Sequence, residues 1–237
     1  MLLVVLVSGT ALLYDVHGNL GALEAVLADT SAPGVETFVL GGDYALFGAS
    51  PFETVVRLRA LGDHTWIRGN GERWTARPDE APDNPVVRGA IAACRAALGA
   101  ELVAELAWLD EQAVLGTTRY CHASPVSDVR SFLPEPAGDE AELLAGVTEP
   151  RLVFGHTHLP FARVAEVGGI ELVNPGSVGM PFDGDPRAAW ALLHEDGRIE
   201  HRRVEYDHEA AAGAVLERFG EAEWTETVAR RIRRARM

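Results

Sequence analysis

The chain has 237 residues, of which 47% are apolar and 24% are charged, values typical of a folded domain rather than a disordered segment. Its formal net charge is −14, and all 21 basic residues are arginine. An acidic surface repels polyanions, which argues against a general DNA- or RNA-binding protein. It does not exclude an enzyme that binds a phosphate ester beside metal cations.

The first seven residues, MLLVVLV, are apolar but carry neither the basic residues nor the cleavage site of a signal peptide. The sequence leaves open whether residues 1–8 form an extra strand or an upstream extension. No apolar run approaches the roughly 20 residues of a membrane span, so no membrane association is expected. Cys94 and Cys121 lie outside any CxxC pattern and predict two reduced, buried thiols in a cytoplasmic protein.

The first two thirds of the chain alternate short apolar runs with helical patterns. The apolar runs predict buried strands, which fall at residues 11–14, 37–40, 65–67, 119–121 and 152–154. Residues 20–27, after the capping residue Asn19, and residues 52–61, after Ser50-Pro51, have the pattern of helices. Strands alternating with helices indicate a mainly parallel sheet with covering helices.

Residues 76–110 interrupt this alternation. A Pro-rich acidic loop at 77–85 precedes two helical patterns, 86–98 and 101–109, which are joined at Gly99. These patterns predict a helical hairpin inserted as a cap on the active-site side, while a structural flank fits them equally well.

The last third of the chain is predicted to begin with an antiparallel meander. Its strands fall at residues 162–167, 171–173, 188–194 and 198–204, with Gly168-Gly169 and Asp196-Gly197 as turns. Helices at 209–219 and 223–234 then fill the terminal segment 207–237. Because no linker-like stretch divides the chain, a single domain over residues 1–237 is expected.

Five of the predicted strands end in a side chain that can bind a metal. Ligands of α/β sheets bind beyond the carboxyl ends of the strands, so these side chains are expected to meet at one edge. The predicted metal ligands are Asp15, His17, Asp43, Asn70, His122, His156 and His158. A set of carboxylate, amide and imidazole groups without thiolate suits Mn, Fe, Zn, Ni or Co. Seven ligands exceed what one tetrahedral ion needs and fit two divalent ions that share a carboxylate.

Taken together, these segments carry a family resemblance over residues 11 to about 194. Asp15-Val16-His17-Gly18-Asn19, Gly42-Asp43, Gly69-Asn70, His122 and Gly155-His156-Thr157-His158 resemble the signature blocks of the calcineurin-like metallophosphoesterases. The segment 174–179, Asn-Pro-Gly-Ser-Val-Gly, is similar to one found in their small bacterial and archaeal phosphodiesterase branch.

The resemblance implies an α/β (α+β) fold, a four-layer α-β-β-α sandwich of two mixed sheets with a dinuclear centre between them. It assigns Asp15, His17 and His158 to the first ion, Asn70, His122 and His156 to the second, and Asp43 to both. Two such cations, manganese foremost, lower the pKa of a bridging water and supply hydroxide for hydrolysis of phosphate esters, most of all phosphodiesters. Asp43, Asn70 and His17 are therefore the residues expected to act in catalysis.

One position departs from the family pattern. Many relatives have a histidine after the Gly-Asn pair that assists the leaving group, whereas this chain has Gly71. General-acid assistance is typically worth ~10²–10⁴-fold, so esters with poor leaving groups should react slowly. Asn19, Asn174 and Ser177 are candidate substrate-binding residues, although a helix cap or a turn explains each of them equally well.

Two other functions compete with hydrolysis of a small phosphate ester. One is a catalytically weak, metal-bound scaffold or regulatory binding protein, against which the intact ligand set argues. The other is a nuclease, against which the acidic charge and the lack of a basic stripe argue. The sequence does not decide the physiological substrate, the native metal or the oligomeric state, with a homo-oligomer among the alternatives.

Overall fold

The computed structural model describes residues 9–31, residue 35 and residues 37–237, so the predictions for residues 1–8 lie outside the described residues. The strands are β1 (Gly9–Leu13), β2 (Thr37–Leu40), β3 (Asp63–Trp66), β4 (Gln112–Leu115), β5 (Thr118–Cys121), β6 (Arg151–Val153), β7 (Phe161–Val164), β8 (Glu171–Asn174), β9 (Ala188–His194) and β10 (Ile199–Val204). The α-helices are α1 (Leu20–Ser31), α2 (Pro51–Arg59), α3 (Asn70–Ala76), α4 (Pro85–Ala107), α5 (Glu140–Leu143), α6 (His208–Phe219) and α7 (Glu223–Arg234).

The strands form two mixed five-stranded sheets. In the first, with order β10-β9-β1-β2-β3, β1 pairs in parallel with β2 and β2 with β3, while the β9–β10 hairpin adds antiparallel strands at one edge. In the second, with order β4-β5-β6-β8-β7, three parallel central strands lie between antiparallel edge strands. Both sheets therefore point the carboxyl ends of several parallel strands at one edge, as the predicted site requires.

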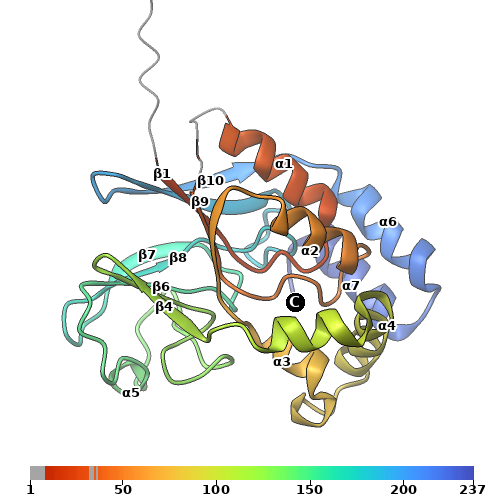
Figure 1. Cartoon of the computed structure of the whole chain (residues 1–237), viewed down its shortest axis with the longest axis horizontal. Helices are drawn as coiled ribbons and strands as arrows, with labels where there is room; N and C mark the ends of the chain where they lie inside the picture. The colour runs from red at the N-terminus through yellow and green to blue at the C-terminus, as the bar shows by residue number, and fades with distance from the viewer. Residues whose placement is uncertain (1–8, 32–34, 36) are drawn as a thin grey trace, which may run out of the picture.

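The layers follow from which side of each strand is apolar. Leu12, Val39, Tyr120 and Val153 form a buried cluster between the two sheets. On the other side of the first sheet, alternate residues such as Leu13 belong to the large cluster that includes the helices. Figure 1 shows α1, α2 and α6 beside the first sheet and α5 beside the second. The predicted α/β class with two mixed sheets is confirmed, although, within the described residues, the outer layer on the second sheet has only one four-residue helix.

The prediction of an antiparallel meander after His158 is wrong. The four strands form two hairpins, β7–β8 and β9–β10, which belong to different sheets. Strand β8 pairs in parallel with β6 and not only with its hairpin partner. Alternating hydrophobicity identifies strands, but a hairpin turn fixes only the nearest pairing, so the sequence did not reveal the second partner of each hairpin.

The segment 76–110 contains the two predicted helices, which together form α4 and are separated at Gly99, where φ is 76° and the helix is interrupted. Helix α4 packs against α3 and α7. Its role as a cap over the active site stays a prediction. Helix α3 and strand β4, which flank this segment, were not predicted. The terminal helices at 209–219 and 223–234 are present as α6 and α7.

Cys94 and Cys121 are both buried free thiols, as predicted. Within the described part of the chain, none of the helices is both long and apolar enough to cross a bilayer.

Candidate metal centre

Each predicted metal ligand lies just beyond a parallel strand. Asp15 and His17 follow β1, Asp43 follows β2, Asn70 begins α3 after β3, His122 follows β5, and His156 and His158 follow β6. Six of the seven side chains are almost completely buried, and His156 is half-buried. The structure brings all seven together, as the distances below establish.

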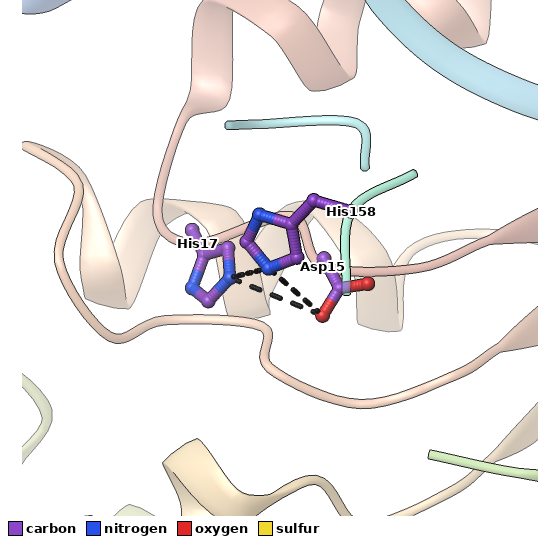
Figure 2. Close-up of side chains that lie close together, drawn as sticks. All are labelled: Asp15, His17 and His158. Carbon is purple, nitrogen blue, oxygen red and sulfur yellow. Dashed lines mark hydrogen bonds and ion pairs between the residues drawn. The ribbon is translucent and has the colours of Figure 1, made fainter. Parts of the chain in front are cut away.

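Asp15, His17 and His158 form the first group. The Nε2 atoms of the two imidazoles are 3.0 Å apart, and Oδ1 of Asp15 lies 3.4 Å from Nε2 of His158 and 3.9 Å from Nε2 of His17. Figure 2 shows the three side chains pointing toward one another, Asp15 and His17 from the loop after β1 and His158 from the loop after β6. Their ligand atoms are close enough to hold one metal ion.

Asp15, Asp43 and His122 form a second group that could hold an ion. Nε2 of His122 lies 3.5 Å from Oδ1 of Asp43 and 4.0 Å from Oδ1 of Asp15. The other oxygen of Asp43, Oδ2, lies 3.8 Å from Nε2 of His17. The Asp43 carboxylate thus presents one oxygen to each group.

Asn70 and His156 extend the second group. Oδ1 of Asn70 lies 3.0 Å from Nε2 of His122, and the same position lies 2.8 Å from Nδ1 of His156. In this orientation the amide oxygen faces only hydrogen-bond acceptors. A half-turn of the amide would place Nδ2 there instead, as a donor to both imidazole nitrogens. An oxygen and two imidazole nitrogens converging on one point is the arrangement that ligands adopt around a cation.

Hydrogen bonds to the backbone decide which imidazole nitrogens face the site. Nδ1 of His17 bonds the carbonyl of Leu46 at 3.0 Å, and Nδ1 of His122 bonds the carbonyl of Gly41 at 2.8 Å. A carbonyl only accepts, so Nδ1 carries the hydrogen and the Nε2 lone pair is left for a metal. Nδ1 of His158 makes the same kind of bond to the carbonyl of Met180.

The Asp15 carboxylate also indicates whether these side chains suit a metal ion. Oδ2 accepts a hydrogen bond of 3.0 Å from the backbone N–H of His156. Oδ1 is buried and has no hydrogen-bond partner among the described residues. A buried carboxylate oxygen without a partner is costly, and a cation at this point would compensate it. The donor set therefore fits divalent metal ions.

The backbone is strained at the same positions. Among the described residues, seven other than glycine have a positive φ, and five of them are predicted ligands: Asp15, His17, Asp43, His156 and His158. Left-handed conformations cost of order 1–3 kcal/mol each and are retained where the surrounding structure enforces them, often at functional sites.

Gly42 shows how tight the packing is. Its φ is 96°, and a Cβ there would lie 2.7 Å from both Nδ1 of His122 and N of Gly69.

Glu72 is a positioning residue that the sequence analysis did not identify. Its Oε2 accepts hydrogen bonds from the backbone N–H groups of Asp43 at 2.9 Å and Gly69 at 2.8 Å, and its Oε1 accepts one from Tyr44 at 2.8 Å. This carboxylate, only 4% exposed, therefore joins the loop that carries Asp43 to the start of the helix that carries Asn70. The available signal was a glutamate three residues after Gly69, the spacing of a capping box.

Comparisons with known proteins agree with this geometry. A model of the calcineurin-like phosphoesterase superfamily domain matches residues 10–198. The chain belongs to this superfamily. The family is one of metal-dependent hydrolases, and the Asp and His clusters described above fit its divalent ions.

Individual relatives of this phosphoesterase cover almost the whole chain. The uncharacterized protein MJ0912 of Methanocaldococcus jannaschii is 30% identical to it, over 87% of this chain and 91% of that protein. A metallophosphoesterase from Sphaerobacter thermophilus has 29% identity and a TM-score of 0.81, over 96% of this chain and 98% of the other. The hypothetical protein PH1004 from Pyrococcus horikoshii, at 20% identity, has a TM-score of 0.83 with the same coverage, which shows the shared fold.

The three residues suggested for substrate binding make hydrogen bonds within this phosphoesterase fold. Asn19 caps α1 by accepting from the backbone N–H of Ala22 at 3.2 Å, and its Nδ2 donates to the carbonyl of Gly179 at 2.8 Å. Nδ2 of Asn174 donates to the carbonyl of Gly155 at 3.1 Å. Within the described residues, neither these two nor Ser177 lines the cavity beside the metal ligands. Their role in substrate binding stays a prediction.

Replacing Ser177 by alanine should destabilise the phosphoesterase fold next to the metal ligands. Its buried Oγ donates to the carbonyl of Asp15 and accepts from the backbone N–H of Met180, both at 2.8 Å. Loss of both bonds leaves buried polar groups without partners, which should lower the free energy of unfolding by about 1–3 kcal/mol. Urea denaturation of the metal-free protein measures this, and an unchanged midpoint would contradict it.

Histidines of this phosphoesterase should make the metal-free protein sensitive to acid. Burial, with the nearby His158, lowers the pKa of His17 to about 3, and burial, with His122, lowers that of His156 to about 4. The pKa of histidine in an unfolded chain is about 6.5. On acidification the unfolded state therefore binds protons at these histidines before the folded state does. The stability contributed by the neutral imidazoles is present above pH 6.5 and is lost as the pH falls toward 4.

Urea midpoints of metal-free protein at pH 7.5, 6 and 5 measure this loss. Burial raises the pKa of Asp43 to about 7, so this carboxyl acts in the opposite direction and loses its contribution as the pH rises. A variant must therefore be compared with wild type at each pH. His17→Gln should show a smaller fall in midpoint between pH 7.5 and 5, whereas His201→Gln, at the exposed position of strand β10, should match wild type. Parallel curves for all three proteins would refute the assignment to His17.

Proposed function

We propose that the protein hydrolyses phosphate esters, phosphodiesters in preference, at a centre of two divalent ions. The observation that supports this is the convergence of seven side chains that present lone pairs to one another. Among them, Oδ1 of Asp15 is buried with no partner in the described part of the chain. Such an arrangement is unfavourable without cations and favourable with them.

The proposed ligand assignment follows the two groups of side chains. Asp15, His17 and His158 hold one ion, and the other is held by Asn70, His122 and His156. Asp43 contributes to both, consistent with Oδ2 lying 3.8 Å from Nε2 of His17 and Oδ1 lying 3.5 Å from Nε2 of His122. Asn70 adds an oxygen without adding negative charge to a site that already contains two aspartates.

When bound, a pair of divalent ions lowers the pKa of water and neutralises charge on the phosphoryl oxygens. The residues of the chain hold these ions at fixed positions. His17, His122 and His158 are each oriented by a backbone carbonyl, and the strained loops leave little room for rearrangement. In the net reaction, the oxygen of water joins phosphorus, one ester P–O bond breaks, and the departing alcohol leaves with a proton.

Gly71 limits which esters react well. Its position has no side chain, and its backbone N–H donates to Oδ1 of Asp43 at 2.6 Å. Two nearby side chains that could donate a proton or a hydrogen bond in its place already have partners. Nδ1 of His64 bonds the carbonyl of Gly62, and Arg73 bonds both Asp128 and Glu80. We therefore propose that esters of acidic alcohols, such as phenols, are favoured because they leave without a proton donor.

The partner and the location are part of the same proposal. A small phosphate ester is the proposed substrate, and general nucleic-acid binding is disfavoured by the net charge of −14. The two buried free thiols are consistent with a reducing compartment such as the cytoplasm.

Purified protein supplied with Mn²⁺ and bis(4-nitrophenyl) phosphate tests this proposal. We expect release of 4-nitrophenol that stops on addition of EDTA and returns with excess Mn²⁺, and two metal ions per chain by elemental analysis. Stoichiometric metal without turnover, for Mn²⁺, Zn²⁺, Ni²⁺, Co²⁺ and Fe²⁺ alike, would instead favour the metal-bound scaffold. Salt-sensitive binding of DNA would favour the nuclease.

A further inference from the structure

A cavity of ≈530 Å³ lies against the metal centre. One side of it is formed by five of the seven predicted ligands, His17, Asp43, Asn70, His156 and His158. The remaining walls come from segments for which no function has been assigned so far, including α7 near the end of the chain. A substrate whose phosphate reaches these five side chains would lie in this cavity.

Arg231 of α7 lines the cavity without an acceptor. Its Nε is enclosed and has no hydrogen-bond partner among the described residues. Burial and the neighbouring Arg230 lower the pKa of Arg231, and no carboxylate contributes to that shift. A half-buried guanidinium without a counter-ion is costly, so this position favours binding of an anion.

Other arginines near the site differ in this respect. Arg68, Arg73 and Arg130 are the arginines to compare with it. Each forms an ion pair with a carboxylate: Arg68 with Glu111, Arg73 with Asp128, and Arg130 with Glu142. Among the residues that the structure describes, Arg231 has no such partner, so its guanidinium remains available for a phosphate.

A second hydrogen-bond donor without a partner also indicates that the cavity binds a phosphate ester. Trp74 of α3 lines the cavity and is only 9% exposed, and its indole Nε1 has no partner in the described part of the chain. Indole N–H groups that are buried usually find an acceptor. A phosphate ester offers several oxygens that can accept from both Trp74 and Arg231.

The rest of the cavity wall is mostly apolar, with Ser131 and Thr157 as its polar members. Phe182 stacks on the ring of His158, with centroids 4.4 Å apart and planes 17° apart, so it is held flat beside a metal ligand. Phe47 packs against the His17 ring with centroids 5.5 Å apart. Leu133 and Val129, which are 46% and 41% exposed, form an apolar rim. These surfaces suit an aromatic or otherwise apolar ester group and offer few partners to a sugar.

We propose that Arg231 binds the phosphoryl oxygens of the substrate and that this apolar wall holds an aryl or similarly apolar ester group. The inference rests on the proposed function, because it specifies the substrate class of that same site. Guanidinium and phosphate form charge-assisted, often bidentate hydrogen bonds, for which lysine is a poor substitute.

Arg231→Gln tests the phosphate contact, with Arg230→Gln as a control that makes the same charge change at the exposed neighbouring residue. Arg231→Gln should lower kcat/KM for bis(4-nitrophenyl) phosphate roughly 10- to 100-fold, mainly through KM, with metal content unchanged. It should weaken binding of inorganic phosphate, measured by calorimetry at fixed ionic strength, by a similar factor. Arg231→Lys should have a kcat/KM and a phosphate affinity between those of wild type and Arg231→Gln. Arg230→Gln should match wild type in both.

If Arg231→Gln has the same phosphate affinity and the same KM as wild type, Arg231 does not bind the substrate phosphate. If the wild type binds phosphate through Arg231 but hydrolyses no ester, the proposed function fails and this contact stands. If wild type neither binds phosphate nor turns over, both fail.

The apolar wall is tested with two diesters that share the 4-nitrophenol leaving group. The wild type should have a KM at least about 10-fold lower for bis(4-nitrophenyl) phosphate than for methyl 4-nitrophenyl phosphate, because only the former buries a second ring. Leu133→Ser should reduce this preference, whereas Val114→Ser, at a 47% exposed position on β4 outside the cavity, should retain it. Equal KM values for both esters in the wild type would refute the apolar subsite.

Discussion

If the proposed function holds, Asp43→Asn should remove most of the bound metal and lower the turnover of bis(4-nitrophenyl) phosphate by more than about 100-fold. Residues that only orient a metal ligand typically contribute 10–100-fold, so loss of a carboxylate shared between two groups should exceed that range. The amide keeps one oxygen for the N–H of Gly71 but presents an NH₂ group to the site in place of the second oxygen. Elemental analysis after loading with Mn²⁺ and dialysis, together with turnover of bis(4-nitrophenyl) phosphate, measures both effects.

The same substitution should leave the metal-free fold intact. The Asp43 carboxyl is buried near Asp15 and Glu72, and burial with these neighbours raises its pKa to about 7. An uncharged amide removes that repulsion, so the thermal midpoint in EDTA should be equal to or above that of wild type. Asp139→Asn, at an exposed position, is the matched control. Full metal content and activity in Asp43→Asn would eliminate the bridging role.

Glu72→Gln should weaken both the fold and the metal centre without removing a ligand. The carboxylate accepts from three backbone N–H groups, and a glutamine amide must turn its own N–H toward at least one of them. We expect a loss of about 3 kcal/mol in the free energy of unfolding and a 10- to 100-fold weaker affinity for Mn²⁺. Urea denaturation and calorimetric titration with Mn²⁺ measure these quantities, with Glu111→Gln on the surface as control.

The activity in excess Mn²⁺ should distinguish Glu72→Gln from Asp43→Asn. In Glu72→Gln all seven ligands are present but less well positioned, so millimolar Mn²⁺ should restore much of the activity. In Asp43→Asn a ligand oxygen is missing, and added Mn²⁺ should restore little. Wild-type Mn²⁺ affinity in Glu72→Gln despite reduced stability would show that Glu72 supports only the fold.

The sequence alone identified the seven side chains that the structure brings together, because each of them follows a strand within a few residues. Asp15, Asp43 and His122 come straight after apolar runs that form β1, β2 and β5. Runs of this kind are visible over four or five neighbouring residues, and parallel strands bring their ends to one edge of a sheet. The same local signals predicted the interruption at Gly99 and the two C-terminal helices.

The tertiary structure decided what depends on residues far apart in the chain. The pairing of β6 with β8, the three backbone contacts of Glu72 and the position of Arg231 in the metal-side cavity all fall in this class. No pattern of hydrophobicity near Arg231 shows that, among the described residues, its guanidinium has no ion-pair partner and lines the same cavity as Asn70. Local sequence encodes the type of an element, whereas its neighbours are chosen by packing of the whole chain, and packing determines which polar groups are left without partners.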